Sequence, residues 1–223
     1  NVAGWVDVNT TLHSVFYKGL DGKLWNYYKN SSGTYVKLAV GGNTNVNSYV
    51  KSSPDGQSVF YRGNDGFLWR YYQSGSIWIN QKITTPQNSS ITVVGDISPA
   101  SSNLVYFRGP LNKVLCWDGQ LGSVYELTPD LANCAGYIVN NQNGVFYKGN
   151  DNRLWHLYWH HDQWYYESID YNNPNVSGSM TTSSDGKLFY IGSPTSGTTN
   201  TIWEVNTLAC KPFTMLGCSH NGG

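Results

Sequence analysis

The chain has 223 residues, of which 15% are aromatic and only 13% are charged, and its formal net charge at pH 7 is zero. This balance argues against nucleic acids and anionic membrane surfaces as partners, because both are held by a basic surface. No apolar run approaches the roughly 18 residues that a spanning helix needs, so we expect no membrane insertion.

A motif built on aromatic residues, glycine and tryptophan recurs along the chain. Residues 16–25 read Phe-Tyr-Lys-Gly-Leu-Asp-Gly-Lys-Leu-Trp, close copies lie at 60–69 and 146–155, and weaker copies lie at 106–109 and 189–192. The aligned glycines are spaced by 44, 46, 40 and 43 residues, and they are Gly19, Gly63, Gly109, Gly149 and Gly192. A period in the forties with strand-like content is typical of propeller blades. The sequence therefore predicts an all-β fold, a five-bladed β-propeller with four antiparallel strands per blade.

Each repeat is expected to hold four strands in the same order. Apolar first strands with small central residues, suited to the crowded propeller axis, are expected at 2–6, 46–50, 93–97, 134–138 and 176–180. The Val-Phe-Tyr run forms the second strand, and an Asp-Gly or Asp-Asn turn leads to a third at 24–28, 68–72 and 154–159. Fourth strands are expected at 35–40, 77–83, 124–127 and 164–169. Repeat three departs from the pattern, with Pro-Leu-Asn at 110–112 and no tryptophan at the usual place.

No linker divides the repeats, so we expect a single domain over 1–223. Its blades are expected at approximately 1–44, 45–90, 91–132, 133–174 and 175–223. Because the repeats begin at a first strand and end after a fourth, the ring is expected to close by packing of blade one on blade five.

Residues 63–73 fit the Phe-x-x-Gly-x-Asp-x-x-Leu-Trp-x-x-x-Gln blade signature of a bacterial group of repeat β-propeller lectins. The chain resembles this family over nearly its whole length, strongly in three repeats and weakly in two. The tachylectin and tectonin lectins are looser relatives in architecture. The resemblance implies a multivalent lectin or hemagglutinin that binds glycans at several sites between or atop blades. The bacterial group usually has seven blades, so the sugar stays open.

Three sets of repeated side chains are candidates for sugar binding. The aromatic candidates, which could stack on sugar faces or instead form the core between blades, are Trp25, Trp69, Trp155, Trp203, Tyr27 and Tyr71. The basic candidates, which could donate to sugar hydroxyls or form salt bridges between blades, are Lys18, Arg62 and Lys148. The acidic candidates, which also suit the backbone of a turn, are Asp21, Asp65 and Asp151.

The cysteines and glycosylation sequons indicate a secreted, extracellular protein. Cys210 and Cys218 lie close together near the C-terminus, and we expect them to form a disulfide. Cys116 and Cys134 could be free core thiols or a second bridge. Four Asn-x-Ser/Thr sequons occur in the chain.

Catalysis, cofactors and metals are not expected. His160, His161 and Asp162 are consecutive in a turn, where side chains diverge, so we expect no metal site. Glycoside hydrolysis needs two carboxylates flanking one bond, whereas strong internal repetition favours repeated binding over one asymmetric active site. Two alternatives stay open. One is a glycoside hydrolase of the five-bladed type, and the other is a protein- or peptide-binding scaffold with an exposed apolar patch.

Overall fold

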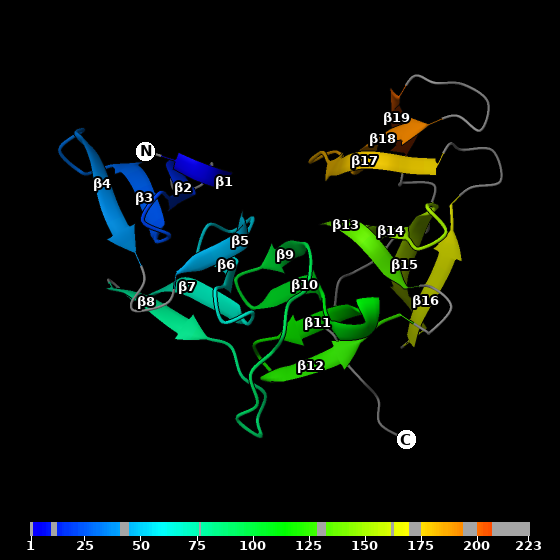
Figure 1. Cartoon of the computed structure of the whole chain (residues 1–223), viewed down its shortest axis with the longest axis horizontal. Helices are drawn as coiled ribbons and strands as arrows, with labels where there is room; N and C mark the ends of the chain where they lie inside the picture. The colour runs from blue at the N-terminus through cyan, green and yellow to red at the C-terminus, as the bar shows by residue number, and fades with distance from the viewer. Residues whose placement is uncertain are drawn as a thin grey trace.

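The protein is an all-β propeller whose five blades follow one another around an arc (Figure 1). The computed structural model describes residues 2–9, 13–40, 45–75, 77–128, 133–161, 163–169, 175–193 and 200–206. Four blades are four-stranded antiparallel sheets, and the fifth shows three strands among the described residues. The predicted fold class is therefore confirmed, while the fourth strand expected in repeat five lies outside the described residues.

Each sheet falls inside the interval expected for its repeat. Blade 1 holds β1 (Val2–Asn9), β2 (Ser14–Gly19), β3 (Leu24–Lys29) and β4 (Tyr35–Val40). Blade 2 holds β5 (Val46–Ser52), β6 (Ser58–Gly63), β7 (Leu68–Ser74) and β8 (Ile77–Lys82). Blade 3 holds β9 (Ile97–Ser101), β10 (Leu104–Arg108), β11 (Val114–Asp118) and β12 (Ser123–Glu126). Blade 4 holds β13 (Cys134–Asn141), β14 (Gly144–Gly149), β15 (Leu154–His160) and β16 (Gln163–Ser168), and blade 5 holds β17 (Asn175–Thr182), β18 (Lys187–Ser193) and β19 (Thr201–Asn206).

The second strand of each repeat is buried on both faces because a blade is wedged between two neighbours. Successive side chains of a strand point to opposite faces. Phe60 of β6 accordingly packs with Trp117 of blade 3, and the adjacent Tyr61 packs with Phe16 of blade 1. Both β6 side chains are fully buried. The apolar clusters thus lie between consecutive blades, and they explain why the Val-Phe-Tyr run repeats.

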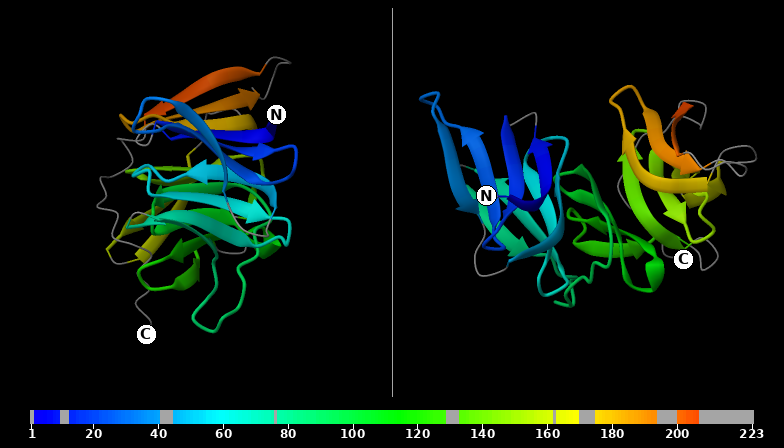
Figure 2. Two further views of the ribbon diagram at one scale, coloured as in Figure 1. Left: turned by 90° about the vertical axis from the view of Figure 1, so that its left-hand side faces the viewer. Right: turned by 45° about the horizontal axis from the view of Figure 1, so that its top comes forward.

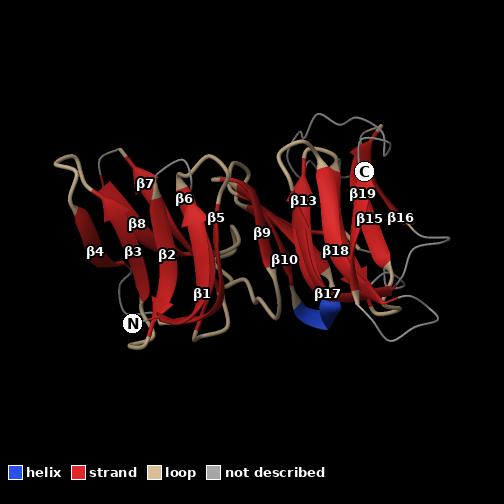
Figure 3. Cartoon of the chain, turned by 90° about the horizontal axis from the view of Figure 1, so that it is seen from above, coloured by secondary structure: helices blue, strands red, loops and turns tan. Residues whose placement is uncertain are grey.

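Blade 3 departs from the repeat at the turn between its second and third strands and at the start of its first strand. A short 3-10 helix, η1 (Pro110–Asn112), replaces the Asp-Gly turn, and it is the blue element at one edge in Figure 3. The first strand of this blade begins at Ile97 rather than at residue 93, because the backbone N–H groups of Val94 and Gly95 both donate to the Arg108 carbonyl. Leu115 stands where the other blades carry tryptophan.

The first and last blades stand at the two ends of the arc (Figure 2). Contacts between first strands join β1 to β5, β5 to β9, β9 to β13 and β13 to β17. On blade 1, Tyr27 and Tyr35 stack on each other at 5.3 Å and are 42% and 60% exposed. The equivalent pair on blade 2, Tyr71 and Trp78, packs on Phe16 of blade 1. The pair on blade 2 is thus covered by the preceding blade, whereas the pair on blade 1 is exposed. Among the described residues, blade five does not cover the tyrosine pair of blade one as ring closure was expected to do.

Of the four cysteines, Cys116 and Cys134 lie among the described residues. Cys134 is a free, buried thiol, whereas Cys116 is disulfide-bonded. A bridge between the two is therefore excluded, and the alternative that both are free thiols is wrong for Cys116. The expected bridge between Cys210 and Cys218 lies outside the described residues and stays a prediction. In the part of the chain that the structure describes, no helix is long and apolar enough to cross a membrane.

Candidate functional site

The repeated tryptophan and aspartate form a hydrogen-bonded pair within each intact repeat. The indole Nε1 of Trp25 donates to Asp21 Oδ1 at 3.0 Å, and that of Trp155 donates to Asp151 Oδ1 at 3.1 Å. The same carboxylates accept the backbone N–H two residues further on, which is the bonding of an Asp turn. In blade 2 the pair is Trp69 with Asp65. The structure therefore places these six candidates together as three equivalent pairs.

These pairs hold the third strand to the turn that precedes it. A Cβ atom at Gly149 would lie 2.5 Å from Asp151 Oδ1 and 2.6 Å from the Trp155 ring, so only glycine lets the indole close over the turn. Trp155 is half-buried, and one of its faces stacks on Tyr147 with centroids 6.5 Å apart. The geometry supports a structural role for the repeated pair and leaves only part of each ring to solvent.

Lysines cover the tryptophan rings of the first two blades. Lys37 Nζ lies 4.9 Å above the Trp25 ring, and Lys82 Nζ lies 5.7 Å above the Trp69 ring. A cation above an aromatic face is attracted by the ring quadrupole. A sugar that stacked on either face would first have to displace the lysine.

Two basic residues join neighbouring blades. Lys18 Nζ donates to the carbonyl oxygen of Asn47 at 3.1 Å, and Arg108 Nη1 donates to that of Ala135 at 3.1 Å. Asn47 and Ala135 occupy the same place in the first strand of the following blade. The structural alternative for Lys18 was a salt bridge between blades. Lys18 does connect two blades, but its acceptor is a backbone carbonyl and not a carboxylate.

The remaining sequence candidates are distributed over separate places. Arg62 Nη1 donates to the Asn47 side chain at 3.3 Å within blade 2, and Lys148 is half-buried on β14. Trp203 of β19 is half-buried and pairs with Tyr190 of β18. Tyr27 is exposed on blade 1. These four residues do not gather with the Trp–Asp pairs into one pocket.

A cavity of about 200 Å³ lies between blades 1 and 2. Its lining comes from strands β2, β3 and β4 of blade 1 and from β7 and β8 of blade 2, and it consists of Ser14, Asn26, Tyr28, Leu38, Tyr71, Gln73 and Trp78. The rings of Tyr71 and Trp78 stack at 4.7 Å with an interplanar angle of 15°, which makes a continuous aromatic wall. Burial raises the pKa of Tyr71 to about 12, so its hydroxyl is protonated at neutral pH.

In the part of the chain that the structure describes, two polar atoms of this cavity have no hydrogen-bond partner. Asn26 is 7% exposed and Ser14 is 2% exposed, and both Asn26 Oδ1 and Ser14 Oγ are buried without a hydrogen bond. Leaving such a group unsatisfied costs about 1–3 kcal/mol. A ligand that donates to Asn26 Oδ1 and exchanges a hydrogen bond with Ser14 Oγ recovers this free energy while it packs on the aromatic wall. Of the sequence candidates, only Tyr71 lies in this cavity.

Asn26 was not among the sequence candidates because its position changes from one blade to the next. The position after the tryptophan holds Asn26, Arg70, Cys116 and His156 in the first four blades. Variation at one position of an otherwise regular repeat is the signal that could have indicated a site there.

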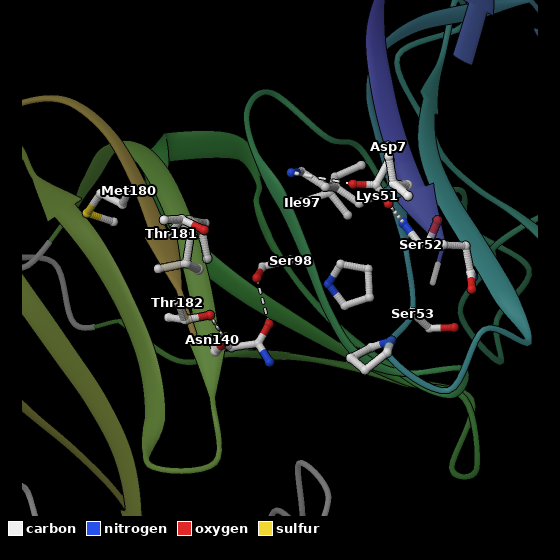
Figure 4. A pocket seen from close by; sticks show the side chains of 16 residues that line it. Asp7, Lys51, Ser52, Ser53, Ile97, Ser98, Asn140, Met180, Thr181 and Thr182 are labelled. Carbon is white, nitrogen blue, oxygen red and sulfur yellow. Dashed lines mark hydrogen bonds and ion pairs between the residues drawn. The ribbon is translucent and has the colours of Figure 1, made fainter. Parts of the chain in front are cut away.

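A second cavity, of about 360 Å³, lies at the axis and is lined by the first strands of all five blades (Figure 4). Several of its polar groups already bond across the blades, although Ser52 Oγ is buried without a hydrogen bond. The side-chain amide of Asn140 lies 2.6 Å from Ser98 Oγ, and Asp7 accepts the backbone N–H of Ser52 at 2.7 Å and lies 3.9 Å from Lys51 Nζ. These bonds join neighbouring blades around the axis and give this cavity a structural role.

Among the described residues, the three glutamates do not converge into one cleft. They lie in three different blades, and each is paired with a lysine or a histidine of its own blade. The pairs are Glu126 with Lys113 at 3.0 Å, Glu167 with His156 at 3.3 Å, and Glu204 with Lys187 at 2.9 Å. Within the described ranges, no group of three His, Cys, Asp or Glu side chains could hold a metal ion.

Comparison with known proteins supports the fold and leaves the function open. No protein-family model matches the chain, and no curated protein matches it. Among solved structures, one similar chain belongs to the crystal structure of the mitotic checkpoint complex, with a TM-score of 0.58 and 16% identity over 94% of this chain. The chain covers 61% of that neighbour's length. A likeness at this identity concerns the propeller fold alone.

Proposed function

We propose that the protein is a carbohydrate-binding lectin without catalytic activity and that the cavity between blades 1 and 2 is its principal sugar site. The observation that carries this proposal is the combination of the Tyr71–Trp78 wall with the unpartnered Asn26 Oδ1 and Ser14 Oγ. A sugar ring offers both chemistries, since its C–H faces pack on aromatic rings and its hydroxyls donate and accept hydrogen bonds.

The size of the cavity suits a small ligand. Its volume of about 200 Å³ is below the about 300–1,000 Å³ of pockets that take drug-sized molecules. One sugar ring, or the terminal part of a glycan, is the largest ligand that this volume supports. The lining contains no charged side chain, which favours a neutral sugar over an acidic one.

The lectin-like motif of the intact repeats implies several sites, which would gain avidity on a surface that displays many glycans. The cavity itself lies at one blade interface of the described residues, so we propose one principal site per chain. The proposal includes an extracellular location, where such surfaces are found.

A protein-binding scaffold is the second candidate function. It is favoured by the exposed, stacked Tyr27 and Tyr35 on blade 1. An exposed aromatic pair of this kind is a feature of protein–protein contact surfaces.

A glycan array with two matched variants separates the candidates. Trp78→Ala removes half of the aromatic wall of the cavity, whereas Tyr35→Ala removes the equivalent aromatic residue on the exposed face of blade 1. We expect the chain and Tyr35→Ala to bind the same neutral glycans and Trp78→Ala to lose them with its fold retained. Absence of glycan binding, or equal binding by both variants, would contradict the proposed site.

A further inference from the structure

The internal repeat supplies a second copy of the cavity for comparison, at the interface between blades 2 and 3. Asn26 and Arg70 each follow the repeated tryptophan, and each side chain points toward the next blade. Ser14 and Ser58 are also equivalent, because they pair with Tyr28 and Tyr72 in the same register. The two interfaces therefore share a serine and a tyrosine and differ at the residue after the tryptophan.

Arg70 occupies the second copy of the cavity. Its Nε donates to Ser58 Oγ at 2.9 Å, so this serine has the partner that Ser14 lacks. Its guanidinium lies 4.1 Å from the Tyr72 ring and 5.7 Å from the ring of Trp117 in blade 3. Trp117 is buried, with 7% of its surface exposed.

The later interfaces are filled in other ways. Cys116 is fully buried in the apolar cluster between blades 3 and 4. His156 is buried, lies 2.9 Å from the Asn143 carbonyl through Nε2 and stacks on Phe146 at 4.5 Å. Of the four side chains, Asn26 is the one whose polar atom is left without a partner in a cavity.

We propose that the residue after the repeated tryptophan position decides which blade interfaces admit a ligand and that Arg70 closes the interface between blades 2 and 3. The identity of the ligand, a neutral sugar ring, rests on the proposed function; the closure by Arg70 does not. Replacing Arg70 with asparagine frees the facing rings of Tyr72 and Trp117 and lets Ser58 Oγ accept a hydrogen bond from a ligand, while this hydroxyl keeps its own bond to the Ser102 carbonyl at 3.3 Å. The variant so opens a second site of related chemistry.

Acrylamide quenching of tryptophan fluorescence tests the closure without a sugar. Acrylamide is a small neutral amide that quenches an indole on contact, and the signal of Trp117 is obtained by subtracting the matched Trp117→Phe variant. We expect Arg70→Asn to raise the quenching constant of Trp117 several-fold, and Arg153→Asn, which removes an exposed arginine, to leave it unchanged. An unchanged constant in folded Arg70→Asn would overturn the proposal.

The converse variant keeps the test valid if Arg70→Asn does not fold. Asn26→Arg should place a guanidinium beside Ser14 and Tyr28 and lower the acrylamide quenching of Trp78, which is measured against Trp78→Phe. Unchanged quenching of Trp78 would count against the proposal.

Calorimetric titration with the sugar that gives the strongest array signal adds the binding arm. We expect Arg70→Asn to bind one more sugar per chain than the parent, and Asn26→Arg to bind one fewer. A Trp117 that opens to acrylamide in a chain that binds no sugar would contradict the proposed function and support the closure. If the parent binds sugar and Arg70→Asn gains no second site, the proposed function is supported and the closure by Arg70 is contradicted.

Discussion

The indole nitrogen of Trp69 donates to both carboxylate oxygens of Asp65, at 3.1 and 3.3 Å, and Lys82 Nζ lies 3.0 Å from the same carboxylate. These contacts tie the turn before β7 to β7 itself and to the end of β8. Burial alone would raise the pKa of Asp65, but the contacts with Lys82, Trp69 and the Phe67 N–H hold it below its usual value. The most regular feature of the sequence thus holds the turn to the third strand in blades 1, 2 and 4.

Trp69→Phe should destabilise the protein by about 1 kcal/mol, because it keeps an aromatic ring and removes one partly exposed hydrogen bond to a charged group. The measurement is the free energy of unfolding in urea. Asp65→Asn and the double variant complete a mutant cycle, in which the two effects should be less than additive. Full additivity would show that the Trp–Asp bond contributes nothing to stability.

Asn26→Leu should stabilise the fold and abolish sugar binding. Leucine has a similar size and removes the unpartnered amide oxygen of Asn26, which costs about 1–3 kcal/mol while it stays buried. Thermal unfolding and the glycan array are measured on the same preparation. Asn47→Leu is a matched control away from the cavity and should keep binding. A less stable Asn26→Leu that still binds glycans would show that Asn26 serves packing alone.

Stability should decrease as the pH falls below about 6.5, the ordinary pKa of histidine. Burial lowers the pKa of His156, against the opposing hydrogen bonds to the Asn143 carbonyl and to Glu167. The unfolded chain therefore takes up this proton at a higher pH than the folded chain, and folding is disfavoured progressively below that value.

Urea unfolding between pH 8 and pH 5 measures this dependence. His156→Gln should flatten the part of the slope that lies below the ordinary histidine pKa. His161→Gln, which removes an exposed histidine, should leave the slope as it is. Equal slopes in all three proteins would exclude His156 as the group responsible.

The Cys134 thiol should be unreactive in the folded protein. The side chain is buried, and burial raises the pKa of Cys134 to about 12, whereas the thiolate is the reactive form. Alkylation with iodoacetamide followed by peptide mass spectrometry should label this residue only after unfolding. The same non-reducing maps would show whether Cys210 and Cys218 are bridged. Rapid labelling of Cys134 in the folded chain would contradict its burial.

The repeat spacing by itself determined the class of fold and the number of blades, because a blade is built from local contacts. Asp21 and Trp25 are four residues apart and one turn brings them together, so a pattern read along the chain captures the pair. The consecutive apolar residues Val59, Phe60 and Tyr61 of β6 point to both faces of the sheet in turn. They likewise predict that both faces are buried, as the structure shows.

Only the tertiary structure decided where the candidate site lies. Asn26 and Trp78 are 52 positions apart in the sequence, and they meet because blade 2 is laid against blade 1. One repeat carries a short amide where the next carries an arginine, and the longer side chain reaches Ser58 Oγ across its interface, whereas Ser14 Oγ accepts no such bond. A period shared by all repeats cannot indicate a difference of this kind, because the difference takes effect only across the interface between two blades.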